Sequence, residues 1–346
     1  MSLSRGERDG RPNAVWRLLL TGLLLAVTTI LFSAVLSPIA FLLGVREAAP
    51  TPTDGAFIPP GILLTGSLAS LAATFLSISV ACRWLDRRPL ADLGLRLTPA
   101  WWADLGFGLL LGVAAIGVAF AIEIALGWVE ITGFGPTEGG GAFLVELLIA
   151  LVIFGSVGVY EELIMRGYVM KNIAEGLNSS SSSATVAVYA GLVLSAAIFA
   201  LPHIFNPGAS FAGILNILGS GVLVLGLGYA LTGRLGLPIG VHISWNFAQG
   251  FLFGLPTSGA VVGRYPVLMT EQTGPALMTG GAFGLEGGAL GTLALIVACA
   301  ATLIWAGVRE GRLSIHEEIA EPPVSSQDQG RASGEDATPL PEQPDA

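Results

Sequence analysis

The sequence predicts an all-α polytopic membrane protein. Of its 346 residues, 53% are hydrophobic and only 12% are charged, whereas soluble domains carry about 25% charged residues. The mean hydropathy is +0.73. Apolar runs recur along the chain, and each is long enough to cross a bilayer, which takes about 20 residues. We therefore expect about eight transmembrane helices that enclose a polar intramembrane cavity.

Eight apolar segments fit this length. They cover approximately residues 16–44, 61–82, 103–127, 142–170, 184–204, 211–231, 236–256 and 287–307. The first is too long for a signal peptide and lacks a small-residue cleavage site, so we expect a retained helix. The predicted domains are a cytoplasmic N-terminal segment at 1–15, a helical membrane domain at 16–307 and a disordered acidic cytoplasmic tail at 308–346, which is rich in Pro, Ser, Glu and Asp.

The basic residues predict the orientation of the helices. With a cytoplasmic N-terminus, most Lys and Arg side chains fall on the cytoplasmic side, and only Arg46 and Arg264 fall on the other. The positive-inside rule therefore places both termini in the cytoplasm. Residues 46–60 and 257–286 are loops rich in Gly, Pro and Thr that carry no chemical motif. The second is long enough to be a lid or a slack connection, and we favour the slack connection. Glu123 and Glu146 lie near helix ends and are expected to reach the outer membrane interface.

Two adjacent carboxylates, Glu161 and Glu162, lie inside the apolar stretch VELLIALVIFGSVGVYEELIMRGYVM. An ionised side chain near the bilayer centre costs about 2.5 to 3.5 kcal/mol on insertion scales, so such residues usually face a protein interior or a wet cavity. Glu162 and Arg166 are four residues apart and share one helix face, which predicts an ion pair. Glu161 is rotated by about 100° from Glu162 and stays available for chemistry.

Two of the three histidines in the chain accompany this pair. In IFALPH, Phe199 and His203 are four residues apart, and Pro202 is expected to kink or end the helix. In HISWN, His242 and Asn246 share a helix face. One carboxylate, two imidazoles and one amide suit hydrolysis. Glu161 with His203 can polarise a water molecule, and His242 with Asn246 can donate to the oxyanion that develops on a carbonyl.

The same residues allow a metal site. Glu161, His203 and His242 make a His₂Glu set, which is a known catalytic zinc arrangement with water in the fourth position. The local HExxH signature is absent, and the three ligands come from separate helices. We therefore favour a metal-free glutamate mechanism over zinc.

At these residues the chain resembles the CPBP family of intramembrane proteases, named for CAAX proteases and bacteriocin-processing enzymes. The motifs EExxxR, FxxxH and HxxxN follow one another on successive helices, and the resemblance covers about residues 83–255, with RRPLADLGLRL similar to the family's entry segment. The resemblance implies an intramembrane endopeptidase in which Glu161 and His203 activate water while His242 and Asn246 stabilise the oxyanion. Glu162, Arg166 and Phe199 are expected to support this site. The implied substrate is a membrane-associated peptide or protein, such as a prenylated CAAX protein.

The predicted orientation imposes a condition on this site. The fifth helix carries His203 toward the outer side, away from Glu161, unless that helix ends within the bilayer. Pro202 and the following Asn206, Pro207 and Gly208 offer such a break, which is tolerated at membrane depth where it lines a cavity. We therefore predict a cavity that opens toward the cytoplasm.

Two other functions use the same helices. Buried Glu, His and Arg residues can form a proton or metal path in a transporter, although no inverted repeat is visible between the two halves. A catalytically silent scaffold or bacteriocin-immunity protein would need only the helices, and the intact set of four polar residues argues against it. The expected partners are the lipid bilayer and a membrane-associated substrate, with no nucleic acid.

Overall fold

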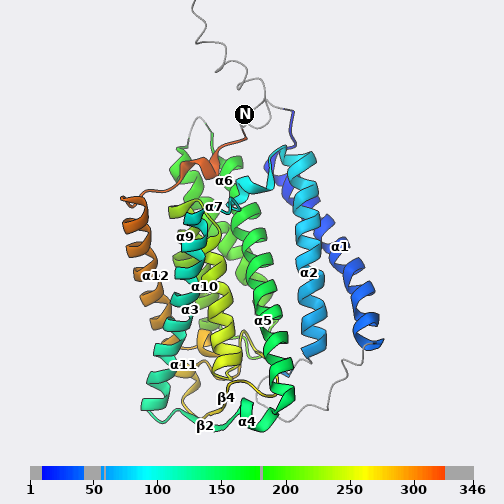
Figure 1. Cartoon of the computed structure of the whole chain (residues 1–346). Coiled ribbons are helices and arrows are strands. Elements are labelled where there is room, and N and C mark those ends of the chain that lie inside the picture. Colours follow the sequence, from blue (N-terminus) through cyan, green and yellow to red (C-terminus); the bar gives the residue numbers. More distant parts are fainter. Residues whose placement is uncertain (1–9, 43–55, 58–59, 180–181, 324–346) are drawn as a thin grey trace, which may run out of the picture.

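The chain forms a bundle of long, nearly antiparallel helices (Figure 1). The structure, a computed structural model, describes residues 10–42, 56–57, 60–179 and 182–323. The main helices are α1 (Ala14–Leu42), α2 (Pro60–Ala81), α3 (Pro99–Ala125), α5 (Gly141–Glu162), α7 (Ala184–Ala200), α8 (Phe211–Ser220), α10 (Gly236–Phe247) and α12 (Ala289–Glu310). Shorter helices are α4 (Gly135–Gly139), α6 (Lys171–Leu177), α9 (Leu227–Thr232) and α11 (Ala276–Thr279). The predicted all-α membrane fold is confirmed.

Seven helices within the described residues are long and apolar enough to cross a membrane. The predicted segment at 236–256 forms α10, which a π-helical segment extends to Leu252. This helix is shorter than the about 20 residues that a span requires. Gly254, which has a φ of +65°, lies just beyond its end. The predicted number of about eight transmembrane helices therefore includes α10, which is short. This helix lies at the centre of the bundle.

Tight packing around α10 comes from glycines on its neighbours. A Cβ atom on Gly112 of α3 would lie 2.7 Å from the Trp245 backbone nitrogen, and one on Gly158 of α5 would lie 2.5 Å from the Ile243 side chain. Only glycine permits these approaches. Because Ile243 follows His242 and Gly158 precedes Glu161 by one turn, the contact between α5 and α10 brings these two polar residues together.

Several helices contain π-helical or 3₁₀ segments. The π-helical segments are Cys82–Asp86, Leu163–Met170, Gly221–Gly226 and Ala248–Leu252. The 3₁₀ segments are Leu90–Leu93, Leu201–Phe205, Gly281–Phe283, Leu285–Gly287 and Glu317–Ala320. The π-helical segment Leu163–Met170 begins directly after the two carboxylates, Glu161 and Glu162. π-Helical turns occur frequently at functional sites.

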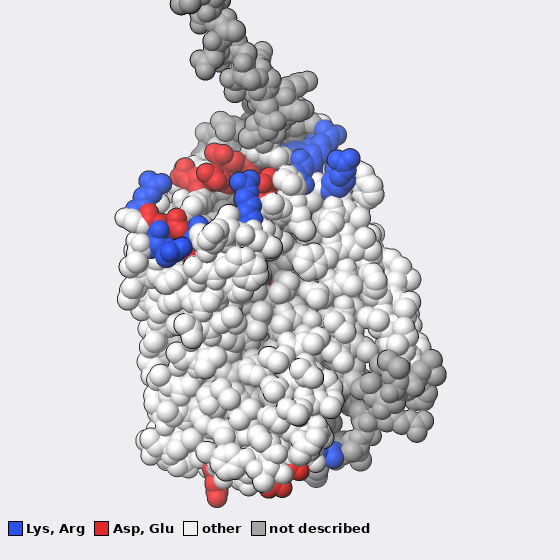
Figure 2. All heavy atoms as spheres, viewed as in Figure 1, with Lys and Arg blue, Asp and Glu red and all other residues white. Residues whose placement is uncertain are grey.

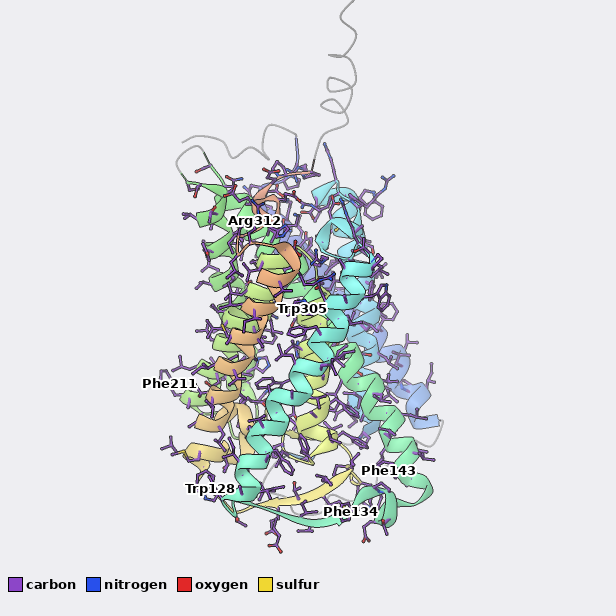
Figure 3. The ribbon with its side chains drawn as sticks, turned by 60° about the vertical axis from the view of Figure 1, so that its left-hand side comes forward. Trp128, Phe134, Phe143, Phe211, Trp305 and Arg312 are labelled. Atoms are coloured by element: carbon purple, nitrogen blue, oxygen red, sulfur yellow. The ribbon has the colours of Figure 1, made fainter. Side chains whose placement is uncertain are left out.

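The predicted break in the fifth helix is present. α7 ends at Ala200, the chain turns through Leu201–Phe205, and α8 begins at Phe211. Figure 3 shows Phe211 well above Trp128 and Phe134, which mark the lower end of the bundle. The turn therefore lies within the height of the bundle. His203 in this turn therefore lies at a height in the bundle where side chains of other helices can contact it.

Basic side chains gather at one end of the bundle, which we call the basic end (Figure 2). It contains the start of α1, the α2 to α3 connection, α6, the turn between α9 and α10 and the end of α12 (Figure 1). Among the described residues, Arg264 is the one Lys or Arg at the opposite end. This distribution agrees with the predicted charge asymmetry. The cytoplasmic location of the basic end stays a prediction.

The opposite end, which we call the loop end, is built from ordered connections. Strand β2 (Val129–Phe134) pairs antiparallel with β4 (Leu268–Gln272), with an irregularity between Ile131 and Gly133. Strand β1 (Ala56–Phe57) pairs in parallel with β3 (Ala260–Val261). The prediction of slack connections is wrong for residues 257–286, because backbone pairing, α11 and two 3₁₀ turns order this segment. Of residues 46–60, those at 46–55 and 58–59 lie outside the described residues.

The start of the C-terminal tail also differs from the prediction. His316 donates its backbone N–H to the Ala230 carbonyl at 2.8 Å, and Ile319 and Ala320 are buried. Lys171 Nζ donates to the Glu318 carbonyl at 3.1 Å. The predicted disordered tail therefore does not begin at residue 308, because apolar residues beyond α12 still pack against the bundle. Residues 324–346 lie outside the described residues, as do residues 1–9 of the predicted N-terminal segment.

Candidate active site

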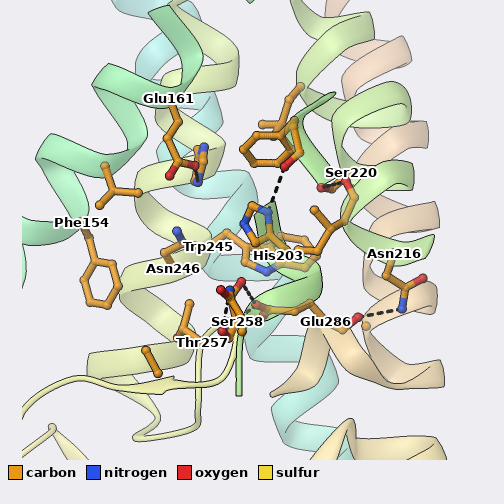
Figure 4. A pocket seen from close by; sticks show the side chains of 18 of the residues that line it. Phe154, Glu161, His203, Asn216, Ser220, Trp245, Asn246, Thr257, Ser258 and Glu286 are labelled. Carbon is orange, nitrogen blue, oxygen red and sulfur yellow. Dashed lines mark hydrogen bonds and ion pairs between the residues drawn. The ribbon is translucent and has the colours of Figure 1, made fainter. Parts of the chain in front are cut away.

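All four predicted catalytic residues line one cavity of about 270 Å³ inside the bundle. Glu161 is at the end of α5, His203 is on the turn after α7, and His242 and Asn246 are on α10. Figure 4 shows Glu161 above Asn246, with His203 facing them from the other side. Three motifs that are distant in the sequence thus meet at one cavity.

Glu162 holds two partners. Its Oε1 atom accepts from Arg166 Nη1 at 2.8 Å and contacts His242 Nδ1 at 2.7 Å. All three side chains are buried. The ion pair predicted between Glu162 and Arg166 is therefore present, but the prediction missed that the same carboxylate binds His242. Helical spacing shows partners on the same helix and cannot show one that comes from α10.

Glu161 faces the cavity. Its Oε2 atom lies 3.6 Å from His242 Nε2, and its side chain is 24% exposed, whereas Glu162 is fully buried. The two carboxylates therefore bracket one imidazole, with Glu162 at Nδ1 and Glu161 at Nε2. The Glu161 carboxylate thus lies beside His242 and lines the same cavity as His203, with which it is predicted to polarise water.

His203 is oriented by its own turn. Its Nδ1 lies 2.9 Å from the Phe199 carbonyl oxygen, which can only accept. Nδ1 therefore carries the proton, and Nε2 is left as the second functional nitrogen of the ring. The 3₁₀ turn that follows Ala200 makes this contact possible, because it folds the imidazole back over the last turn of α7.

Phe199 packs against all three motifs. Its ring lies 4.6 Å below the Arg166 guanidinium carbon, 5.0 Å from the His203 ring and 6.1 Å from the His242 ring. A guanidinium over an aromatic face is an attractive cation–π arrangement. Phe199 is 5% exposed. Its ring therefore lies against residues of the EExxxR and HxxxN motifs, and its role in supporting the site stays a prediction.

The cavity has apolar walls between two polar ends. Leu63, Phe154, Val157, Val224 and Leu295 are among the residues that form the walls. The predicted polar cavity is therefore polar only where the motif residues and the connection at the loop end reach it. Apolar walls with a few converging polar groups are typical of ligand-binding sites.

The cavity extends from Glu161 toward the loop end, as Figure 4 shows by the positions of Ser258 and Glu286. Toward the basic end, buried side chains beyond Glu161, among them Arg166 and Tyr168, fill the bundle. The opening of the cavity toward the cytoplasm stays a prediction.

Four polar residues at the far end of the cavity were not predicted from the sequence. Asn206, Thr257, Ser258 and Glu286 all line it. Glu286 is buried, and its Oε1 accepts from the Ser258 N–H and hydroxyl at 2.5 and 2.6 Å. The one signal in the sequence is that Glu286 is the only charged residue within the Gly-rich stretch GGAFGLEGGALG.

The geometry does not form a ready metal site. Among the residues that the structure describes, no group of three or more His, Cys, Asp and Glu side chains is arranged to hold a metal ion. Glu161, His203 and His242 line the same cavity, but His242 has Glu162 on one nitrogen and Glu161 on the other. A carboxylate on the second ring nitrogen is common for metal-binding histidines, so zinc binding by the predicted His₂Glu set stays a prediction.

The family comparison covers this site. Residues 143–248 match the family model described as "Type II CAAX prenyl endopeptidase Rce1-like". The matched stretch contains all seven residues of the three motifs and ends before Ser258 and Glu286. No curated protein and no solved structure matches the chain. This family is one of proteases that act on membrane-associated proteins, and it supports intramembrane endopeptidase activity at the family level. Residues 143–248 of this multi-pass chain therefore match an Rce1-like type II CAAX prenyl endopeptidase domain, which is consistent with the CPBP family that the motifs resemble.

Proposed function

We propose that this protein is an intramembrane endopeptidase that hydrolyses a peptide bond in a membrane-associated substrate, such as a prenylated CAAX protein. The observation that carries the proposal is the pair of carboxylates around His242, with Glu161 open to the cavity and Glu162 buried beside Arg166. The domain match supports the reaction class.

In the proposed reaction, the Glu161 carboxylate takes a proton from a water molecule in the cavity while the water oxygen attacks the scissile carbonyl carbon. His203, whose Nδ1–H is committed to the Phe199 carbonyl, uses Nε2 to orient that water. The proton then passes to the leaving nitrogen as the C–N bond breaks, so that one water is consumed and one amine and one carboxyl group are released.

The oxyanion that forms on the carbonyl needs hydrogen-bond donors. Asn246 follows His242 by one turn of α10 and lines the same cavity. In its doubly protonated form, His242 donates Nδ1–H to Glu162 and Nε2–H toward the cavity, and the two carboxylates balance its charge. We therefore assign the donor role to His242 and Asn246.

A cleavage assay with a matched control tests the proposal. Wild type, Glu161→Gln and Glu146→Gln are reconstituted in liposomes with a farnesylated CAAX peptide, and each is also expressed in cells that lack the gene. The new chain termini in the membranes of those cells are then identified by mass spectrometry. Both glutamates are on α5, but only Glu161 lines the cavity.

We expect Glu161→Gln to lower the cleavage rate by about 10²- to 10⁴-fold, which is the usual contribution of a general base. Glu146→Gln should cleave at the wild-type rate. Equal cleavage by wild type and Glu161→Gln would contradict the mechanism, and the absence of any new termini with wild type would contradict the function. Chelation in the same assay tests the metal alternative, because loss of activity on chelation would contradict a metal-free site.

We also propose that the basic end faces the cytoplasm, as the positive-inside rule predicts. Two exposed residues at opposite ends, Arg312 and Glu271, are replaced singly by cysteine in a chain without Cys82 and Cys299. A membrane-impermeant maleimide should label Glu271→Cys in intact cells and Arg312→Cys only after permeabilisation. The reverse labelling pattern would overturn the orientation.

A further inference from the structure

The turn that carries His203 lies at the outer surface of the bundle. Phe205 is 89% exposed, and Pro202, Ile204 and Pro207 are also exposed. Within the turn, His203 and Asn206 are half-buried and line the cavity. Few side chains of the turn therefore pack against the interior of the bundle. The position of the turn depends on the contacts of His203 and Asn206.

The connection at the loop end holds this turn. Asn206 donates its side-chain N–H to the Ser258 carbonyl at 2.9 Å and its backbone N–H to the His203 carbonyl at 3.1 Å. One residue thus joins the His203 backbone to residue 258, which is 52 positions further along the chain.

A close backbone contact reinforces this link. Gly259 has a φ of +83°, and a Cβ atom there would lie 2.0 Å from the Pro207 carbonyl oxygen. No side chain fits in that space, so the backbones of the two segments touch directly. A shift of residues 258 and 259 would therefore displace the turn that carries His203.

Glu286 determines the conformation of Ser258. Ser258 has a φ of +46°, which is uncommon for a residue other than glycine. Strained backbone of this kind persists when surrounding groups hold it. Here the Ser258 N–H and hydroxyl both donate to Glu286 Oε1, and the Glu286 carbonyl accepts from Asn216 Nδ2 at 2.9 Å. Figure 4 shows Ser258 and Glu286 together at the far end of the cavity.

We propose that Glu286 is a positioning residue for His203, acting through Ser258 and Asn206. The connection at 257–286 is then the second half of the active site, although it lies outside the matched domain. The positional link stands on geometry alone, and only its effect on catalysis rests on the proposed function.

The small number of histidines allows a direct test. The chain contains only His203, His242 and His316, so a protein labelled with ¹³C and ¹⁵N in histidine gives three sets of imidazole signals in detergent or nanodiscs. Replacement of each histidine by glutamine assigns these signals. The variants are Glu286→Leu, which removes the acceptor, and Glu286→Gln, whose amide oxygen can still accept from Ser258.

We expect Glu286→Leu to displace the His203 signals and to leave those of His316 in place. Glu286→Gln should restore the wild-type His203 signals. Glu146→Leu is the matched control, because Glu146 also anchors this connection, accepting the N–H groups of Arg264 and Tyr265 at 2.8 Å each. Among the described residues, its hydrogen-bond partners do not include Ser258 or Asn206, so the His203 signals should not move.

Unchanged His203 signals in folded Glu286→Leu would overturn the proposal. So would an equal displacement in Glu146→Leu, because general loosening of the connection would then explain the effect. If Glu286→Leu does not fold, Asn206→Ala removes the hydrogen bond between Asn206 and Ser258 instead. This variant should displace the same His203 signals. Unchanged signals in Asn206→Ala would also overturn the proposal.

Cleavage gives a second readout. Glu286→Leu should lower kcat by about 10- to 100-fold, since small misplacements of catalytic groups have effects of that size, and Glu286→Gln should recover most of the loss. The two proposals can fail separately. The absence of new chain termini with wild type would contradict the proposed function and leave the histidine signals informative, whereas unmoved His203 signals would contradict only the role of Glu286.

Discussion

The two ends of the bundle bury carboxylates in different ways. At the basic end, buried Asp and Glu side chains are paired with arginines, whereas at the loop end they accept from N–H and O–H groups. Breaking a buried ion pair leaves an uncompensated charge and costs about 3 to 5 kcal/mol. Removing the acceptor of a buried neutral donor leaves that donor unsatisfied and costs less, about 1 to 3 kcal/mol. The comparison indicates that the basic end serves global stability and that the loop end serves local positioning.

Glu175 is the centre of the basic end. It pairs with Arg11 at 2.8 Å and Arg17 at 2.9 Å and also contacts Arg88. Arg17 reaches Asp86 as well, at 2.8 Å. These contacts join α1, the segment after α2 and α6. They hold the first helix to the bundle, although much of the rest of α1 exposes large apolar side chains.

The loop end contains Glu123, Glu146 and Glu286. Glu123 accepts from Gln272 Nε2 at 3.0 Å and is fully buried, which contradicts the expectation that it reaches the outer interface. Glu146 accepts two backbone N–H groups and is likewise occupied by the connection. Both carboxylates attach the 257–286 segment to transmembrane helices. Both were expected at the interface because they lie near helix ends, and position along a helix does not show contacts with a distant segment.

The largest expected effect is at Glu175. Glu175→Leu removes the carboxylate that three guanidinium groups share, so the free energy of unfolding should fall by about 3 to 5 kcal/mol. Denaturant unfolding in detergent measures this change. Glu130→Leu, at an exposed position in β2, is the control and should unfold like wild type. A loss below about 1 kcal/mol at Glu175 would remove the proposed difference between the two ends.

An intermediate effect is expected at Glu146. Glu146→Leu leaves the Arg264 and Tyr265 N–H groups without this acceptor, which should lower stability by about 1 to 2 kcal/mol. Hydrogen exchange should become faster at residues 264–265 and stay unchanged in α6. Glu146→Gln keeps an acceptor oxygen and should behave like wild type. Faster exchange throughout the bundle would show that the anchor acts globally.

The smallest expected effect is the pH dependence caused by Glu286. Burial raises the pKa of this carboxyl group, and the hydrogen bonds from Ser258 and Gln249 partly oppose the shift. Because the folded-state pKa is higher than the unfolded value of about 4.3, the group stabilises the fold at acidic pH, and this contribution is lost as the pH rises through the folded-state pKa. The thermal midpoint of wild type should therefore fall over this range relative to that of Glu286→Gln. Parallel curves for the two proteins would contradict the pKa shift.

Much of the site could be predicted because its motifs depend on local spacing. The pair of Glu162 and Arg166, the break at Pro202 and the approach of His203 to the other motifs all follow from residues that are close in sequence or from one topological condition. Contacts between distant segments could not be predicted in this way. The link from Glu162 to His242 spans 80 positions, and that from Asn206 to Ser258 spans 52.

The sequence by itself determined the class of protein, the helices and the residues available for chemistry, because apolar length and helical periodicity are local properties of the chain. Only the tertiary structure decided which nitrogen of His242 faces which carboxylate, on which side of Glu161 the cavity lies and how the 257–286 segment closes it. Close packing of α5 against α10 and backbone contact between Gly259 and Pro207 decide these features. Both depend on how surfaces of separate elements fit together, and composition and spacing do not record that fit.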